Sequence, residues 1–524
     1  MWMLHVLRRP RPLSWGLAGL FAALYACVAV NRHRRMLTQA YDLGIFEQAV
    51  RAYAHGEAPV VLLKGPGYQL LGDHFHPLLA TLAPLYRLSP SAVTLLLAQA
   101  VLMALAVVPL ARWAFEVGGP RLAVLVGVLT GASWGIVEAV ADDFHEIAFA
   151  VPLLAFAATA LGRGWPVAAV LWALPLVLVK EDLGLTVAAV GALVFVRAGK
   201  GSGTRALGFG AAVFGLAATA LTVLVVLPSF NPDGGFDYWG QMGTREAAGA
   251  PWEVAGRLVW PPLKWLLLGL AAATAGFLGL RSPLVLLCVP TLGWRLAADN
   301  SHYWGVSYHY SAVLMPLLMA ALVDAVRRTG AFAGPDRVLT RGREAGPDRT
   351  AVRRARRALA VAGLVALVTL PVYPLHELVA PGAWGTSPRL ERARAMLARI
   401  PDGATVAASN RLAAQLAGRT TVGLVCREPS PPLVESPSAG TLSIGAPSAG
   451  TLSVGTLSAG APSAGTLSAG AVRGGPEWVV VDLADPSVQA PCAIADTLRM
   501  LDRYERLGYR RVVDDGDLRL LGRP

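Results

Sequence analysis

Charged residues are scarce in this sequence. Only 15% of its 524 residues carry charge, against roughly a quarter in a soluble globular chain. The shortage is confined to the stretch from Leu13 to Leu375, where long apolar runs alternate with short polar ones, and the composition is ordinary afterwards. This pattern excludes an entirely soluble protein. It predicts a membrane-embedded body followed by a water-soluble C-terminal domain.

Cysteine is rare as well, with four residues whose spacing matches no metal-binding motif. Cys27 and Cys288 lie within apolar runs, where we expect them to be packing residues. Cys426 and Cys492 lie in the C-terminal part, and the sequence leaves both a disulfide and a pair of free thiols open. A cysteine-ligated metal centre is therefore not indicated.

Lysine is the third scarcity, because only four of the 46 basic residues are Lys and the net charge of +12 is carried by Arg. Ten arginines and three acidic residues lie in the segment 327–357, between two apolar runs. Such a stretch is typical of a cytoplasmic loop in a membrane protein. We therefore expect no nucleic-acid partner.

Eleven apolar windows reach or approach the roughly 20 residues that a membrane span needs. The windows are 13–30, 91–111, 122–140, 147–162, 165–179, 183–197, 206–228, 263–280, 282–297, 310–326 and 358–375. The first is longer than a signal-peptide core and lacks a clear small-x-small cleavage site, so we interpret it as an anchor. The predicted fold class is mainly α: a polytopic helical membrane protein with about eleven transmembrane helices.

The arginine distribution predicts the orientation of these helices. With the basic N-terminus in the cytoplasm, the inner loops are 111–121, 162–164, 197–205, 281 and 327–357, and all carry Arg. The outer segments are 31–90, 141–146, 180–182, 228–262, 298–309 and everything after 375; they contain eight of the nine histidines. We expect a multi-pass protein of the cytoplasmic membrane, with polar chemistry at its outer surface.

The predicted domains are a multi-spanning body, 1–380, and an extracytoplasmic α/β domain, 381–524. In the second, the residue pattern predicts strands at 404–408, 420–425 and 478–482, a helix at 495–507 and a hairpin over 510–521 around Asp515-Gly516. Seven pentads such as SPSAG and TLSIG fill 436–470. Such repeats cannot bury a core, so we predict a disordered insertion at 429–475.

Two outer segments share the pattern Asp-x-Phe-His and combine carboxylates with imidazoles at short spacing. Such groups can converge on a divalent cation or hold a phosphate, although polar residues that cap helix ends explain the same pattern. The candidates for a phosphate or metal site are Asp73, His74, His76, Asp142, Asp143, His145 and Glu146.

Lys180-Glu181-Asp182 interrupts two apolar runs. Charges so close to hydrocarbon are costly and indicate a function, so Lys180 joins the phosphate candidates. The alternative is a local pair between the lysine and a carboxylate. Aromatic residues at 236–239 and 301–310 suit sugar rings, and they equally suit an interfacial belt.

Several of these motifs resemble those of a family of bacterial and archaeal membrane proteins, domain-of-unknown-function family 2079. The resemblance rests on Asp42–Gln48, Gly72–Pro77, Asp143–Glu146, Lys180–Asp182, Tyr308–Tyr310, Val406–Asn410 and Trp478–Asp482. That family looks like a distant branch of the GT-C class, multi-spanning glycosyltransferases that use polyprenyl-phosphate sugars.

The resemblance implies an inverting sugar transfer from a polyprenyl-phosphate-linked donor at the outer face of the membrane. Asp42 matches the position of the base, and a divalent cation could assist the leaving phosphate. The substrate-binding candidates are Glu47, Gln48, Glu181, Asp182, His302, Tyr303, Tyr308 and His309.

Two other classes of function remain open on the sequence. A transporter or flippase would place binding residues near the bilayer midplane, and here the middles of the windows are nearly free of charge. A non-catalytic envelope assembly protein would use the C-terminal domain as its binding module. Membrane lipids are expected partners in every case.

Overall fold

The computed structural model describes residues 9–238, 256–332, 348–426, 475–485 and 491–524. The pentad repeats, and with them nearly all of the insertion predicted to be disordered, lie outside the described residues. So does the middle of the basic loop 327–357.

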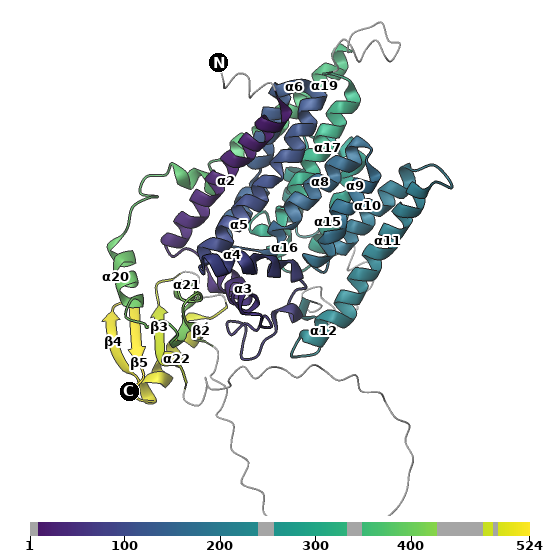
Figure 1. The fold of residues 1–524 in the computed structure, drawn as a ribbon. Coiled ribbons are helices and arrows are strands. Elements are labelled where there is room, and N and C mark those ends of the chain that lie inside the picture. The colour runs from purple at the N-terminus through teal and green to yellow at the C-terminus, as the bar shows by residue number, and fades with distance from the viewer. Residues whose placement is uncertain (1–8, 239–255, 333–347, 427–474, 486–490) are drawn as a thin grey trace, which may run out of the picture.

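Helices form the body of the molecule, and each of the eleven apolar windows falls on helical segments (Figure 1). The main helices of the body are α2 (Pro10–Arg34), α3 (Ile45–His55), α4 (Ala83–Leu88), α5 (Ala92–Leu105), α6 (Val107–Gly131), α7 (Trp134–Ala141), α8 (Ala150–Arg163), α9 (Pro166–Ala173), α10 (Leu183–Arg197), α11 (Gly203–Leu221), α12 (Leu227–Phe230), α14 (Leu263–Thr274), α15 (Val289–Ala297), α16 (Ser301–Trp304), α17 (Leu314–Thr329) and α19 (Arg349–Thr369).

Five helical stretches of the described chain are long and apolar enough to cross a membrane. They are Pro10–Arg34, Ala92–Gly131, Glu146–Arg163, Gly203–Phe230 and His309–Thr329, and four shorter apolar helices lie among them. The protein is thus a multi-pass membrane protein, and the number of about eleven crossings stays a prediction.

The stretch Ala92–Gly131 is a hairpin rather than one long rod. Gly118 and Gly119 leave the helical conformation, and Gly119 has a φ of 74°, which suits a residue without a Cβ. Gly127 consequently lies against Val107 and Ala111. The chain reverses at the two glycines, which separates the windows 91–111 and 122–140 as predicted.

Arginine-bearing turns gather at one end of the body. Arg163 pairs with Glu116, and Arg197 donates to the carbonyl of Leu161 at 3.1 Å. At the C-terminus of α17, Asp324 binds Arg327 at 2.8 Å. These turns belong to loops that the arginine distribution assigns to the cytoplasm, so the structure brings together what the sequence placed on one side.

The C-terminal domain is built on a five-stranded sheet of order β2-β1-β3-β5-β4. Its elements are α20 (Pro388–Leu397), β1 (Thr405–Ala408), α21 (Asn410–Ala414), β2 (Thr421–Leu424), β3 (Trp478–Asp482), α22 (Ile494–Arg506), β4 (Arg510–Asp515) and β5 (Leu518–Gly522). The predicted strands, helix and hairpin are confirmed. Strand β1 runs parallel to β2 and β3, and β5 is antiparallel to β3 and β4.

A disulfide joins Cys426 to Cys492 and settles the pairing that the sequence left open.

This domain docks on the first predicted outer loop, next to the end of α2 (Figure 1). Gln48 of α3 donates to the carbonyl of Val422 at 2.8 Å, and Arg51 donates to that of Thr420 at 2.9 Å. The domain is therefore packed against the body through hydrogen bonds to its backbone.

Candidate functional site

One cavity of about 830 Å³ collects nearly all the polar segments that the sequence places outside. It lies between the helical body and the first outer loop, and it also touches the C-terminal domain through Asn410 and Pro491. Of the predicted site residues, those that line it are Asp42, Asp73, His74, His76, Asp142, His145, Glu146, Lys180, Glu181, Asp182, His302, Tyr303, Tyr308 and His309. If these polar residues only capped the ends of their own helices, they would not need to line one common cavity. Helix capping alone therefore does not explain their convergence.

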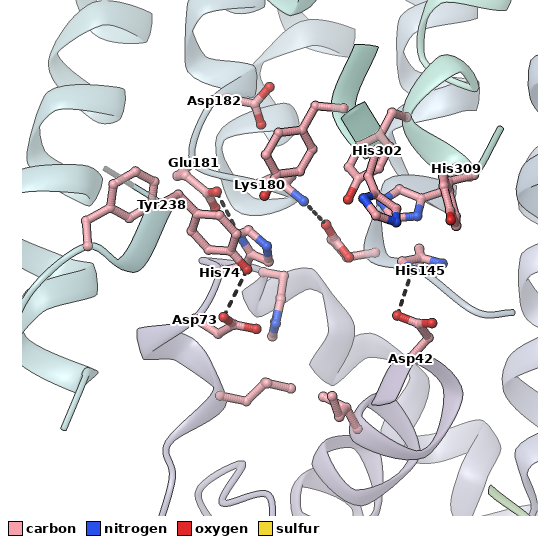
Figure 2. A pocket seen from close by; sticks show the side chains of 18 of the residues that line it. Asp42, Asp73, His74, His145, Lys180, Glu181, Asp182, Tyr238, His302 and His309 are labelled. Carbon is pink, nitrogen blue, oxygen red and sulfur yellow. Dashed lines mark hydrogen bonds and ion pairs between the residues drawn. The ribbon is translucent and has the colours of Figure 1, made fainter. Parts of the chain in front are cut away.

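Asp42 stands on a single π-helical turn, η1 (Ala40–Gly44), that leads into α3. Its side chain is 35% exposed toward the cavity, and Oδ1 lies 3.5 Å from Nε2 of His145 (Figure 2). Burial alone would lower the pKa of His145, but the pairing with Asp42 and other nearby carboxylates raises it to about 9. A cationic imidazole thus faces the Asp42 carboxylate at neutral pH.

Asp143, the neighbour of the cavity-lining Asp142, does not line the cavity. It has a φ of 64°, a conformation uncommon outside glycine, and its Oδ2 accepts a hydrogen bond from the backbone amide of Gln39 at 2.7 Å. This carboxylate therefore braces the residue just before the π-turn, and a direct role in a phosphate or metal site is not favoured by its position.

Asp142, His145 and His309 form a compact trio of possible metal ligands. One donor atom from each lies within 4.8 Å of the others. The imidazoles of His145 and His309 stack with their centroids 3.6 Å apart, and Nδ1 of His309 lies 2.9 Å from Oδ2 of Asp142. Two imidazoles and one carboxylate suit Zn²⁺ or another transition-metal dication.

A buried donor atom without a partner supports that fit. Within the described part of the chain, Nδ1 of His145 is buried and has no hydrogen-bond partner, which is costly unless another group satisfies it. A bound cation and a protonated His145 exclude each other, because a metal-ligating imidazole is neutral. In both arrangements a positive charge lies beside Asp42.

A second polar group lies on the other side of the cavity (Figure 2). Lys64 pairs with Asp73 at 2.9 Å, and the hydroxyl of Tyr238 donates to the same carboxylate at 3.1 Å. His74 pairs with Glu181 at 2.7 Å and stacks on Tyr238 with a centroid distance of 4.6 Å. Lys64 was not among the predicted site residues, whereas Tyr238 belongs to the aromatic stretch 236–239 that the sequence offered for sugar rings or an interfacial belt.

Lys180 lies between the trio and the second polar group, because it pairs with Glu146, the neighbour of His145, and precedes Glu181 in the chain. Its Nζ lies 2.7 Å from Oε1 of Glu146. Burial would lower the pKa of Lys180, but Glu146, Glu181 and Asp182 outweigh it and hold the pKa above its usual range. Asp182 accepts a hydrogen bond from the indole of Trp294 at 2.9 Å, and burial raises its pKa to about 6. Lys180 thus pairs with a carboxylate, but with Glu146, 34 positions away in the sequence, rather than with a neighbour in its own loop, and this pair lies inside the cavity.

The charge of the cavity is negative overall. Six carboxylates line it, against the two ammonium groups of Lys64 and Lys180. With all imidazoles neutral, four negative charges are in excess, and the protonated His145 lowers this excess to three. A phosphate ligand would therefore need a bound cation, or a further protonated histidine such as His74, to overcome the repulsion.

One wall of the cavity is apolar and belongs to a helix at the edge of the body. Helix α11 contributes Leu216, Ala220, Val223 and Leu224 through its last turns and the segment that follows. Leu216 and Leu224 are also 55% and 66% exposed on the surface of the described chain. The polar cavity is thus bordered by a helix whose side chains also face the surroundings of the body.

Two buried polar residues that sequence reasoning missed hold the loops of the cavity. Gln99 on α5 accepts a hydrogen bond from the amide of His145 at 2.9 Å. Arg295 on α15 has no exposed surface and donates to the backbone carbonyls of Tyr303, Gly305 and Tyr310. Their only signal in the sequence is a lone polar side chain inside an apolar window.

Glu47 and Gln48, predicted as substrate-binding candidates, lie outside the cavity lining. Helix α3 turns them toward α4 and the C-terminal domain, where Glu47 accepts a hydrogen bond from Tyr86 at 3.1 Å and lies against Gly418. Gln48 binds the backbone of Val422. Their positions favour a role in docking the domain.

A family model described as "Predicted membrane protein (DUF2079)" matches residues 32–429. The chain belongs to this family. Among solved structures, this DUF2079 protein is similar to ArnT from Cupriavidus metallidurans, whose crystal structure was determined bound to undecaprenyl phosphate. The identity is 16%, the TM-score is 0.50, and the match covers 97% of this chain and 98% of the other. The DUF2079 protein thus has a GT-C-like fold, as the sequence predicted. No curated protein matches it.

Proposed function

We propose that this protein transfers a sugar from a polyprenyl-phosphate donor to an acceptor at the outer face of the cytoplasmic membrane. The observation that carries the proposal is the composition of one cavity. Asp42, the histidine-rich trio beside it and the second polar group around His74 line this cavity together with the apolar wall formed by α11. A lipid-linked phosphate sugar has the same two parts, an apolar chain and an anionic head.

Asp42 is the base in this reaction. It takes the proton of an acceptor hydroxyl while that oxygen attacks the anomeric carbon of the sugar. The bond between the anomeric carbon and the phosphate oxygen breaks, and its electron pair leaves with the lipid phosphate. Attack opposite the leaving group inverts the anomeric configuration.

The leaving phosphate needs positive charge. Lys180, Lys64 and His74 lie in the cavity for this purpose, and each is held by a carboxylate at 2.7–2.9 Å. A dication held by Asp142, His145 and His309 would add charge to the same side of the cavity as Asp42. The similarity to an undecaprenyl-phosphate-bound structure supports this assignment of the lipid.

The orientation is part of the proposal. The disulfide Cys426–Cys492 supports an oxidising compartment for the C-terminal domain, and the arginine-bearing turns gather at the other end of the body. Both features favour a cavity on the outer side.

Replacing the base tests the proposal. We expect Asp42→Asn, expressed in a deletion strain, to restore the missing glycolipid or envelope glycan at least about a hundred-fold more slowly than the unaltered protein. Mass spectrometry of the lipid and glycan fractions gives the measurement. Glu57→Gln is the matched control, because Glu57 is an exposed carboxylate of the same outer loop. Full restoration by Asp42→Asn would remove the base assignment.

A further inference from the structure

The π-helical turn that carries Asp42 is held in place by hydrogen bonds to a residue of the C-terminal domain, Asn410. The first amides of a helical turn have no partner within the turn itself. In η1 the amide of Tyr41 donates to Oδ1 of Asn410 at 2.9 Å, and Nδ2 of Asn410 donates to the side-chain oxygen of Gln39 at 3.0 Å. Asn410 thus binds both Gln39, the residue just before η1, and Tyr41, the residue just before Asp42. Asp143 holds the amide of Gln39 from the other side.

Asn410 is itself held by the sheet. It is the first residue of α21, separated from the end of β1 only by Ser409, and it is 3% exposed. The preceding Ser409 donates its amide to the carbonyl of Val480 on β3 at 3.0 Å and accepts from the amide of Asp482 at 3.1 Å. Asn410 is therefore carried by paired strands, which gives it a defined position at the rim of the cavity.

Other contacts keep the domain docked without Asn410. Gln48 and Arg51 bind the backbone at 420–422, and Gln415 donates to the carbonyl of His33 at 3.2 Å. Asn31 donates to the carbonyl of Ala383 at 2.9 Å. Removing the Asn410 side chain therefore leaves several anchors of the domain in place.

We propose that Asn410 is a positioning residue for Asp42, so that the C-terminal domain is part of the catalytic site rather than a separate binding module. Its amide side chain sets the π-turn from which the carboxylate reaches the cavity. π-Turns are often found at functional sites, and a base displaced by about 1 Å loses much of its effect. The catalytic role of the turn rests on the proposed function. The hydrogen bonds by which Asn410 fixes the turn are independent of that function.

Hydrogen exchange of the purified full-length protein tests whether Asn410 stabilises the turn η1. In Asn410→Ala we expect the amides of Ala40–Gly44 to exchange about ten-fold faster, because an interdomain hydrogen bond is lost. Asn31→Ala is the matched control, since it removes the bond to Ala383 of the same domain from a position nine residues before η1. Unchanged exchange in Asn410→Ala, or equal acceleration by Asn31→Ala, overturns the proposal.

Two further measurements separate positioning from loss of structure. We expect Asn410→Ala to bind undecaprenyl phosphate in nanodiscs within about two-fold of the unaltered protein, while restoring the glycolipid in the deletion strain about ten-fold more slowly. Asn410→Asp keeps the acceptor for Tyr41 and should recover the slow exchange. If Asp42→Asn restores the glycolipid in full, the base assignment fails and with it the catalytic role of the turn, while the exchange result still decides whether Asn410 holds the turn.

Discussion

At the scale of single residues, the trio Asp142, His145 and His309 gives a direct test for a metal. We expect the purified protein to bind Zn²⁺, and His309→Ala to bind it at least about ten-fold more weakly, because one of three ligands is lost. Metal analysis and calorimetric titration measure this without any substrate. His302→Ala is the control, because His302 lines the cavity outside the trio. Equal zinc affinity of both variants would exclude this site.

Glu47 predicts a pH-dependent stability. Burial raises the pKa of Glu47 from its ordinary value of 4.5 to about 7, although Tyr86 and Arg51 oppose the shift. A raised carboxyl pKa means that the folded state pays for ionisation, so stability falls as the pH rises from about 4.5 to 7 and is level above. We expect Glu47→Gln to match the unaltered protein at pH 4 and to exceed it at pH 8 by up to about 3 kcal/mol.

Thermal unfolding in detergent at several pH values checks this expectation. The exposed Glu57 is the control, and Glu57→Gln should show no such gain at high pH. A Glu47→Gln variant whose advantage is the same at pH 4 and pH 8 would mean that Glu47 is ionised at no extra cost in the fold.

At the scale of elements, the contact between α10 and α11 depends on small residues. A Cβ added to Gly208 would lie 2.5 Å from the backbone nitrogen of Phe195, whereas a Cβ on Gly210 meets nothing within 4 Å. Close approach of this kind is typical of helix packing in membranes. We expect Gly208→Ala to lower the unfolding free energy by about 1–3 kcal/mol and Gly210→Ala to raise it by about 0.5–1 kcal/mol.

Unfolding measurements on both variants in the same detergent decide between these signs. Because α11 forms the apolar wall of the cavity, Gly208→Ala should also weaken the binding of undecaprenyl phosphate, and Gly210→Ala should not. Stabilisation by both substitutions would show that α11 does not approach α10 this closely.

Elements were predictable from the sequence where local pattern decides them. The apolar windows and the strands at 405–408 and 478–482 follow from runs of residues that must be buried together. Counting the membrane crossings placed the histidine-rich segments on one side of the membrane, and their meeting in one cavity is compatible with that placement. The roles of Asn410 and Arg295 were not predictable, because their partners are backbone groups of loops that only the tertiary structure brings near. Glu47 and Gln48 were misplaced by proximity to Asp42, since α3 turns them away from the cavity.

At the scale of the whole molecule, the two ends of the body should face different compartments. The turn at Gly164 lies among the arginine-bearing loops, and the end of α3 at Gly56 lies on the side of the cavity. Both glycines have positive φ and open space around them, which suits insertion of a reporter. We expect a reporter at Gly164 to be active only in the cytoplasm and one at Gly56 only outside. Activity of both in the same compartment would contradict the orientation.

The bond between Tyr41 and Asn410 spans 369 positions of the chain, and this distance has a consequence for biogenesis. At a synthesis rate of about 5–20 residues per second, roughly 20–75 s pass between the translation of the two partners. During this interval the early helices are already made, while the turn that carries Asp42 lacks its closing partner. Under the proposed function, a prematurely terminated product that ends before Asn410 would therefore occupy the bilayer without the domain that fixes the Asp42 turn, and full activity would require a chain translated past Asn410.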